Sequence, residues 1–166
     1  MVAHGKVDEG IQKVAEGLRK IEAAGDNLAF HVSWYPAVST YLAAHRFPDG
    51  KALIERAVAE IERSGFRLFE PDIHRLKGEF LVMADGPKTE AESAFREAIA
   101  IARQRQAKSF ELRAATSLAR LLGQEGRRDE ARTTLAEIYN WFTEGFDLPD
   151  LKDAKVLLDE LGYQRN

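Results

Sequence analysis

Apolar residues of alternating size recur along this chain at intervals of about forty positions. In each recurrence three residues are spaced 0, 4 and 7, which places them on one face of a helix. Small residues let two helices approach closely, and the larger residue fills the space between them. A repeat period between about 20 and 50 residues is typical of helical solenoids. The four sets are Gly10/Val14/Gly17, Gly50/Ile54/Ala57, Ala91/Phe95/Ala98 and Ala131/Leu135/Ile138.

A first kind of helix precedes each of the last three sets. These helices are predicted over about residues 28–44, 72–83 and 109–122, where apolar residues follow a helical rather than an alternating period. The chain is therefore predicted to be all-α. The residues expected to face inward are Phe30, Trp34, Ala37, Val38, Tyr41, Leu42, Ile73, Leu76, Phe80, Met83, Leu112, Ala115, Leu118, Ala119 and Leu122.

The two ends of the chain depart from the paired pattern. Residues 6–24 form a helix of the second kind without a first partner, so the chain is expected to begin inside a repeat. Residues 150–161 form a last helix with one apolar and one polar side, as the terminal element of a solenoid requires. Trp141 and Phe142 are expected to lock the last repeat onto this helix. Its apolar stripe is Leu151, Ala154, Leu158 and Leu161.

The helices are expected to begin and end at recognisable residues. Gly25 and Gly65 follow long periodic runs, as C-terminal caps do, and Asp49, Thr89 and Asp129 are predicted N-caps. Seven or eight helices would then stack as a short right-handed superhelix in one domain, residues 1–166. Its predicted parts are a half repeat (1–25), three repeats (26–65, 66–107 and 108–145) and a capping helix (146–166).

The set Ala91, Phe95 and Ala98 resembles the second helix of the tetratricopeptide repeat (TPR), and Gly78 falls where that repeat prefers a small residue. Residues 73–161 also resemble the C-terminal TPR-like region of large bacterial signalling proteins. In those proteins a class III adenylate or guanylate cyclase domain, or a transcriptional-regulator DNA-binding domain, precedes an AAA-type ATPase and a helical array. The stretches that carry this resemblance are Ile73–Glu79, Ala91–Arg103, Glu111–Leu121, Trp141–Asp147 and Asp150–Lys152.

The resemblance implies a TPR-like fold of about 3.5 repeats with a C-terminal capping helix. It also implies a non-enzymatic protein-interaction or regulatory scaffold role in bacterial signal transduction. Nucleotide chemistry is not implied, because the sequence has no cyclase domain and no G-x-x-x-x-G-K-[ST] loop to hold phosphates.

Composition narrows the classes of partner and compartment. The formal net charge is −3, so no global field favours nucleic acid or an anionic membrane. There is no cysteine, which excludes disulfides and suits a reducing cytoplasm. The sequence shows no secretory leader and no apolar run long enough to span a bilayer, so a cytoplasmic protein without membrane contact is expected.

No residue cluster in the sequence predicts catalysis, a metal site or a cofactor. The four histidines form no tight ligand pair. Glu70, Asp72, His74 and Glu79 could be drawn as an acid–base group, but acidic residues at a helix start are explained by the helix dipole. With no cysteine nucleophile and no G-x-S-x-G elbow, the chain is not expected to be an enzyme.

The first helices of a solenoid line its concave surface, where partners bind. Arginine forks pair with carboxylates in a bidentate manner, so an acidic peptide or chain terminus is the expected partner. Replacing Arg113 and Arg120 by glutamate is expected to abolish capture without unfolding. The predicted groove residues are Tyr35, Arg75, Glu79, Arg113, Thr116 and Arg120, with Ser39 and Asp72 beside them.

Three alternatives remain open at this stage. Basic residues between Arg96 and Arg132 could make a nucleic-acid-binding array, although few aromatic residues accompany them and nucleic acid is the less expected partner. The groove could instead hold a small molecule as a sensor. A second copy could pair through the unpartnered first helix, whose apolar stripe is Ile11, Val14, Leu18 and Ile21.

Overall fold

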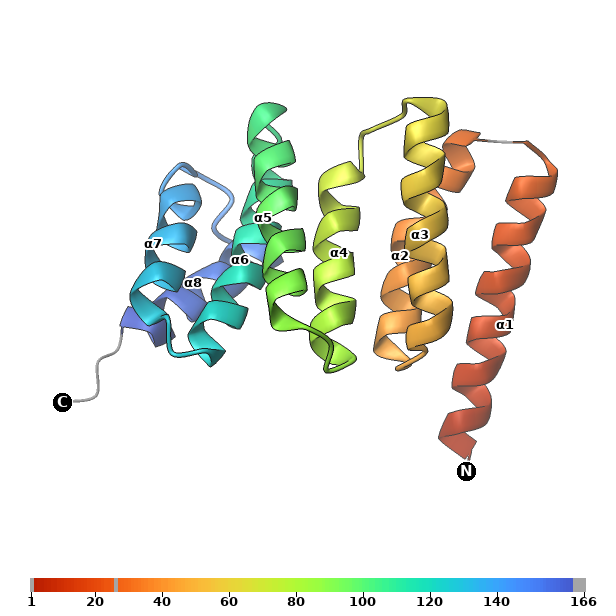
Figure 1. The fold of residues 1–166 in the computed structure, drawn as a ribbon, viewed down its shortest axis with the longest axis horizontal. Helices are drawn as coiled ribbons and strands as arrows, with labels where there is room; N and C mark the ends of the chain where they lie inside the picture. The colour runs from red at the N-terminus through yellow and green to blue at the C-terminus, as the bar shows by residue number, and fades with distance from the viewer. Residues whose placement is uncertain (1, 26, 163–166) are drawn as a thin grey trace. The chain divides into compact units, whose positions relative to one another are not determined.

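The computed structural model describes residues 2–25 and 27–162, with the side chains of all of these except residues 2–6, 27, 28, 30, 31 and 35. The described residues form eight helices and no strands (Figure 1), which confirms the predicted all-α class. The helices are α1 (Val2–Ala23), α2 (Asn27–Ala43), α3 (Phe47–Ser64), α4 (Glu70–Met83), α5 (Lys88–Gln104), α6 (Lys108–Gln124), α7 (Arg128–Tyr139) and α8 (Pro149–Gly162).

The chain divides into two compact units, Met1–Phe69 and Glu70–Asn166. In the first unit, α2 packs against both α1 and α3. In the second unit, α6 packs against α4, α5, α7 and α8, so α4, α6 and α8 form one row and α5 and α7 pack beside it. Consecutive helices therefore pack as pairs within each unit.

The helix boundaries repeat as the sequence predicts. A shift of 81 residues carries α2 onto α6 at both ends, because 27 + 81 = 108 and 43 + 81 = 124. The same shift carries the end of α1 at Ala23 onto the end of α5 at Gln104, and the start of α3 at Phe47 onto the start of α7 at Arg128. The chain thus has a helical repeat-like architecture, and the shift of 81 residues is twice the period of about forty.

Four helices end in the same turn, in which one residue has a positive φ. These residues are His45, Asp85, Gln106 and Gly126, with φ between 53° and 79°. In each turn the next residue's N–H bonds back to a carbonyl five residues earlier, as in a Schellman motif. The bonds are Arg46 N–Tyr41 O at 2.9 Å, Gly86 N–Leu81 O at 2.8 Å, Ala107 N–Ala102 O at 2.9 Å and Arg127 N–Leu122 O at 2.9 Å.

Replacing Gln106 by glycine should stabilise the protein. Gln106 has φ 56°, which strains a residue with a Cβ and suits glycine. We expect Gln106→Gly to raise the free energy of unfolding by about 0.5–1 kcal/mol. The control Gln104→Gly changes the last residue of α5, whose φ is not positive, and should not raise the free energy of unfolding. Urea unfolding of both variants checks the pair, and a loss of stability in both would contradict this reading of the turn.

The predicted N-caps are wrong, whereas the predicted C-cap at Gly65 is confirmed. Asp49, Thr89 and Asp129 lie inside the first turns of their helices, and none is the capping residue. Pro48 is compatible with the first turn of α3, so this helix begins before Asp49. Acidic residues in the first turns of all three helices lie near the positive end of the helix dipole. Gly65 has φ 70°, and its N–H donates to the Ile61 carbonyl at 2.9 Å.

The positions spaced 0, 4 and 7 lie on the inner faces of α3, α5 and α7. All nine residues of these three sets are buried, from Gly50 in α3 to Ile138 in α7. In α8, Leu157 rather than Leu158 completes the buried stripe, and Leu158 is only partly buried. The residues of α5, α7 and α8 belong to the hydrophobic core of the second unit.

The expected role of Trp141 is not observed. Phe142 packs partly against the core, but Trp141 is 57% exposed and meets the Phe142 ring edge-on at 5.2 Å between centroids. Leu151 and Leu157 of α8 already cover this end of the core, and neighbouring side chains of a turn diverge, so only one of the two aromatic rings faces inward.

Candidate interaction surfaces

Three of the predicted groove residues meet around one buried carboxylate. Asp72 in α4 is 2% exposed, and Arg75 Nε donates to its Oδ1 at 2.6 Å. Arg113 Nη1 in α6 lies 3.9 Å from Asp72 Oδ2, and Arg75 Nη1 lies 3.5 Å from Glu79 Oε1. Glu79 also accepts a hydrogen bond from the Ser117 hydroxyl at 2.5 Å. This polar cluster joins α4 to α6.

The arginines of α6 also hold α8. Arg113 Nε donates to Asp150 Oδ2 at 2.7 Å, and Arg120 pairs with Asp153 one turn further along α8. The carboxylates that the sequence analysis assigned to an external peptide are thus supplied by the chain itself. An acidic partner at these arginines would have to displace internal carboxylates.

The other predicted groove residues are placed differently. Thr116 is 4% exposed, and its hydroxyl donates to the Leu112 carbonyl at 2.8 Å, so the expectation that it faces solvent is wrong. A threonine in an apolar helix is commonly buried when its hydroxyl can bond to the carbonyl four residues earlier. The side chain of Tyr35 lies outside the described residues. Arg75, Glu79 and Arg113 are therefore brought together, whereas Thr116 bonds within its own helix and Arg120 pairs with Asp153 of α8.

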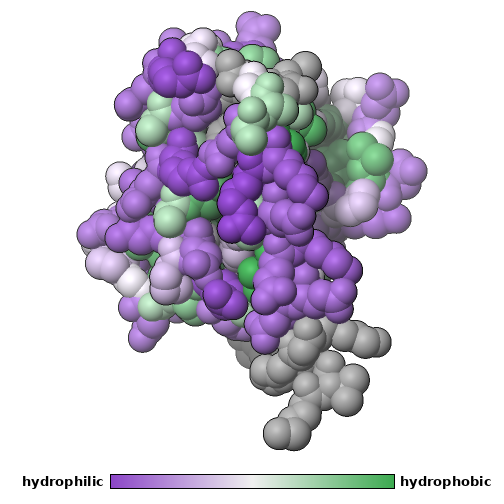
Figure 2. All heavy atoms as spheres, turned by 90° about the vertical axis from the view of Figure 1, so that its right-hand side faces the viewer, coloured by the Kyte–Doolittle hydropathy of each residue, from purple (hydrophilic) through white to green (hydrophobic). Residues whose placement is uncertain are grey.

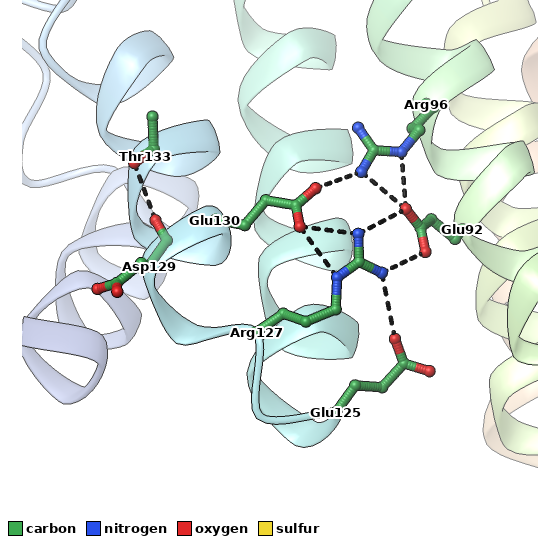
Figure 3. A network of polar contacts seen from close by, with 7 residues as sticks. All are labelled: Glu92, Arg96, Glu125, Arg127, Asp129, Glu130 and Thr133. Atoms are coloured by element: carbon green, nitrogen blue, oxygen red, sulfur yellow. Dashed lines mark hydrogen bonds and ion pairs between the residues drawn. The ribbon is translucent and has the colours of Figure 1, made fainter.

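A closed ring of alternating charges links α5 to the start of α7 (Figure 3). Arg127 donates to Glu92 at 2.7 and 3.2 Å and to Glu130 at 2.9 Å. Arg96 donates to Glu92 at 2.8 Å and to Glu130 at 2.7 Å. Hydrogen bonds from Arg127 hold the pKa of Glu92 below its usual value, and those from Arg96 do the same for Glu130. The ring bridges α5 and the start of α7.

Most of the basic residues that suggested a nucleic-acid-binding array are paired with carboxylates of the chain. Arg103 donates to Glu111 Oε1 at 2.7 Å and lies 2.9 Å from Glu137 Oε2. Lys108 lies 2.8 Å from Glu111 Oε2, and Arg105 pairs with Glu70. Guanidinium groups bound to carboxylates are poor phosphate ligands, so the arrangement does not favour a nucleic-acid surface.

His74 should make stability depend on pH. Burial lowers the pKa of His74 below 6.5, against the opposing charges of Glu97 and Glu70, and Lys77 adds to the lowering. Between the two pKa values the unfolded chain binds the proton more readily, so the free energy of unfolding falls as pH drops below about 6.5. Urea unfolding at about pH 7.5 and about pH 5.5 should show a smaller loss for His74→Gln than for the wild type. An equal loss in both proteins would contradict this assignment.

An open apolar groove lies in the first unit, between α1 and α2. Its volume is about 220 Å³. The hydroxyl of Thr40, on its wall, donates to the Pro36 carbonyl at 2.8 Å and is therefore satisfied within α2. The groove is lined by Val14, Gly17, Leu18, Ile21, Ser33, Pro36, Ala37 and Thr40.

Polar residues surround the apolar ones on this side of the chain. On the face shown in Figure 2, where α1 lies in front, hydrophilic side chains predominate and hydrophobic ones appear as smaller patches. Lys13 and Lys20 of α1 form exposed pairs with Glu9 and Glu16 one helical turn away. Hydrophobic surface on this face is therefore limited to small patches.

The sequence contained a signal for this groove that periodicity alone does not use. α2 has no Asp, Glu, Lys or Arg in its 17 residues. A helix without a charged side is normally covered on several faces. Val14, Leu18 and Ile21 were identified in the sequence as an apolar stripe, but the opposite wall of the groove, on α2, was not.

Within residues 2–25 and 27–162, no group of three or more His, Asp or Glu side chains is arranged to hold a metal ion. None of the helices in that part of the chain combines the length and apolar character needed to cross a bilayer. The sequence matches no protein-family model and no curated protein.

Proposed function

We propose that this chain is a non-enzymatic protein-interaction module, a TPR-like scaffold of stacked helix pairs, acting in bacterial signal transduction. The observation that carries the proposal is the open groove between α1 and α2. Six of its eight lining residues are apolar. Its walls come from α1 and α2, which pack against each other. Such a groove suits the side chains of another polypeptide.

The polar contacts of the second unit support a scaffold role. Arg113 and Arg120 fix α8 on α6, and the ring of Glu92, Arg96, Arg127 and Glu130 fixes α5 beside α7. These pairs hold helix positions rather than leaving reactive groups free. Such an arrangement suits a scaffold that offers surface to a partner.

Affinity capture with a matched pair of variants tests the proposal. Thr40→Lys places a charge in the groove, whereas Thr133→Lys makes the same change on α7. Both threonines donate to the carbonyl four residues earlier at 2.8 Å, so the local loss is the same. We expect a set of proteins that the wild type and Thr133→Lys recover and that falls at least fivefold with Thr40→Lys. Identical recovery by all three would contradict the proposal.

A further inference from the structure

The groove between α1 and α2 has a covered counterpart in the second unit. The shift of 81 residues that superimposes the helix boundaries also carries Val14 onto Phe95 and Pro36 onto Ser117. All eight counterparts of the groove residues are buried, whereas Pro36 is exposed and Val14 only partly buried. The counterparts are Phe95, Ala98, Ile99, Ala102, Ala114, Ser117, Leu118 and Leu121.

Helix α4 covers this counterpart surface. It packs against both α5 and α6. A Cβ built on Gly78 would lie 2.4 Å from Cε1 of Phe95, so the α4 backbone passes directly over that ring. The Ser117 hydroxyl donates to Glu79 of α4 at 2.5 Å. Two counterparts of groove residues therefore touch α4 itself.

The first unit leaves the same surface open. Five of the eight lining residues are only partly buried and Pro36 is exposed, whereas Leu18 and Ala37 are buried. Val14 stands where α5 has Phe95, and Gly17 stands where α5 has Ala98. Both replacements are smaller and contribute to the hollow, whose volume is about 220 Å³.

We propose that an amphipathic helix of another polypeptide docks in this groove, in the position that α4 takes on α5 and α6. The inference rests on the proposed function and names the class of partner. In the second unit, the Phe95 ring fills the space beside Gly78 of α4. In the groove, the smaller Val14 stands at that position, so the docking helix carries a bulky apolar side chain where α4 carries Gly78. That side chain enters the space between Val14, Gly17 and Ala37.

Two peptides made from α4 test this assignment. Both cover residues 70–83 with blocked ends, one with the native sequence and one with Gly78→Leu. Fluorescence anisotropy of the labelled peptides with the full chain should show at least tenfold tighter binding of the Gly78→Leu peptide. A peptide that displaced α4 from the second unit would not show this preference for Gly78→Leu, because the added side chain would collide with Phe95.

A matched pair of glycine substitutions locates the site. Gly17→Leu fills the groove, and Gly10→Leu makes the same change on α1 outside its lining. Both raise helix propensity, so neither is expected to unfold α1. We expect Gly17→Leu to weaken binding of the Gly78→Leu peptide at least tenfold and Gly10→Leu to leave it unchanged. Thr40→Lys on the opposite wall should also weaken binding of the Gly78→Leu peptide. This variant tests the same site without changing a glycine.

Several results would overturn the inference. These are no saturable binding of either peptide, tighter binding of the native peptide, or equal weakening by Gly10→Leu and Gly17→Leu. Self-association that Gly17→Leu abolishes, with no peptide binding, would assign the groove to a second copy instead. Protein capture that depends on Thr40 without peptide binding would overturn the helical partner and leave the proposed function standing.

Discussion

Replacing Gly78 by valine should destabilise the second unit by about 3 kcal/mol, at the upper end of overpacking costs. A Cβ at this position would lie 2.4 to 2.8 Å from three atoms of the Phe95 ring. Phe95 is 1% exposed, so the ring has little room to move. Gly78→Ala should cost about 1–2 kcal/mol, because overpacking is partly offset by better helix propensity.

The control and the rescue use the same unit. Gly162→Ala, at the end of α8, meets no atom within 4 Å and should change the free energy of unfolding by less than about 0.5 kcal/mol. Combining Gly78→Ala with Phe95→Leu should cost at least about 1 kcal/mol less than the sum of the two single changes. Urea unfolding gives all four values, and simple additivity would show that the two residues do not oppose each other.

Arg113→Glu should destabilise the protein by about 3 kcal/mol, since it leaves the buried Asp72 without a cation from α6 and sets two carboxylates together. Arg113 also donates to Asp150 at 2.7 Å, so the change repels α8. Arg120→Glu should cost only about 1 kcal/mol, because its pair with Asp153 is about half exposed. The sequence alone predicted that these two changes spare the fold, whereas the internal pairs predict a loss.

A charge swap separates lost attraction from lost packing. Adding Asp150→Arg to Arg113→Glu restores one pair of opposite charges between α6 and α8. We expect this double variant to regain about 1 kcal/mol relative to Arg113→Glu in thermal or urea unfolding. No recovery, or a cost for Arg120→Glu equal to that for Arg113→Glu, would contradict the placement of Arg113 between the two helices.

Periodicity predicted the helices because burial forces a regular choice of residue. The sets from Gly50 to Ile138 are buried as expected, and Gly78 meets Phe95 through the small–large pattern that the sequence showed. The helix starts were less predictable. Arg46, Pro87 and Arg127 occupy the cap positions, and none makes a side-chain capping hydrogen bond to the start of its helix, so capping chemistry left no signal there.

The candidate site was harder to predict than the fold, because an arginine on a helix can face solvent, bind a partner or pair with a carboxylate of a neighbouring helix. Nothing in the local sequence around Arg113 indicates Asp150, which lies 37 residues away. The groove has one indirect mark in the sequence, which is that α2 carries no Asp, Glu, Lys or Arg.

Methyl NMR with the Gly78→Leu peptide tests most directly whether α1 and α2 present the surface that α4 covers elsewhere. The full chain would be labelled at valine, leucine and isoleucine methyl groups and titrated. We predict chemical-shift changes at Val14, Leu18 and Ile21, with Ile73 and Leu118 unchanged. Changes centred on Ile73 and Leu118, or none in α1, would contradict the account.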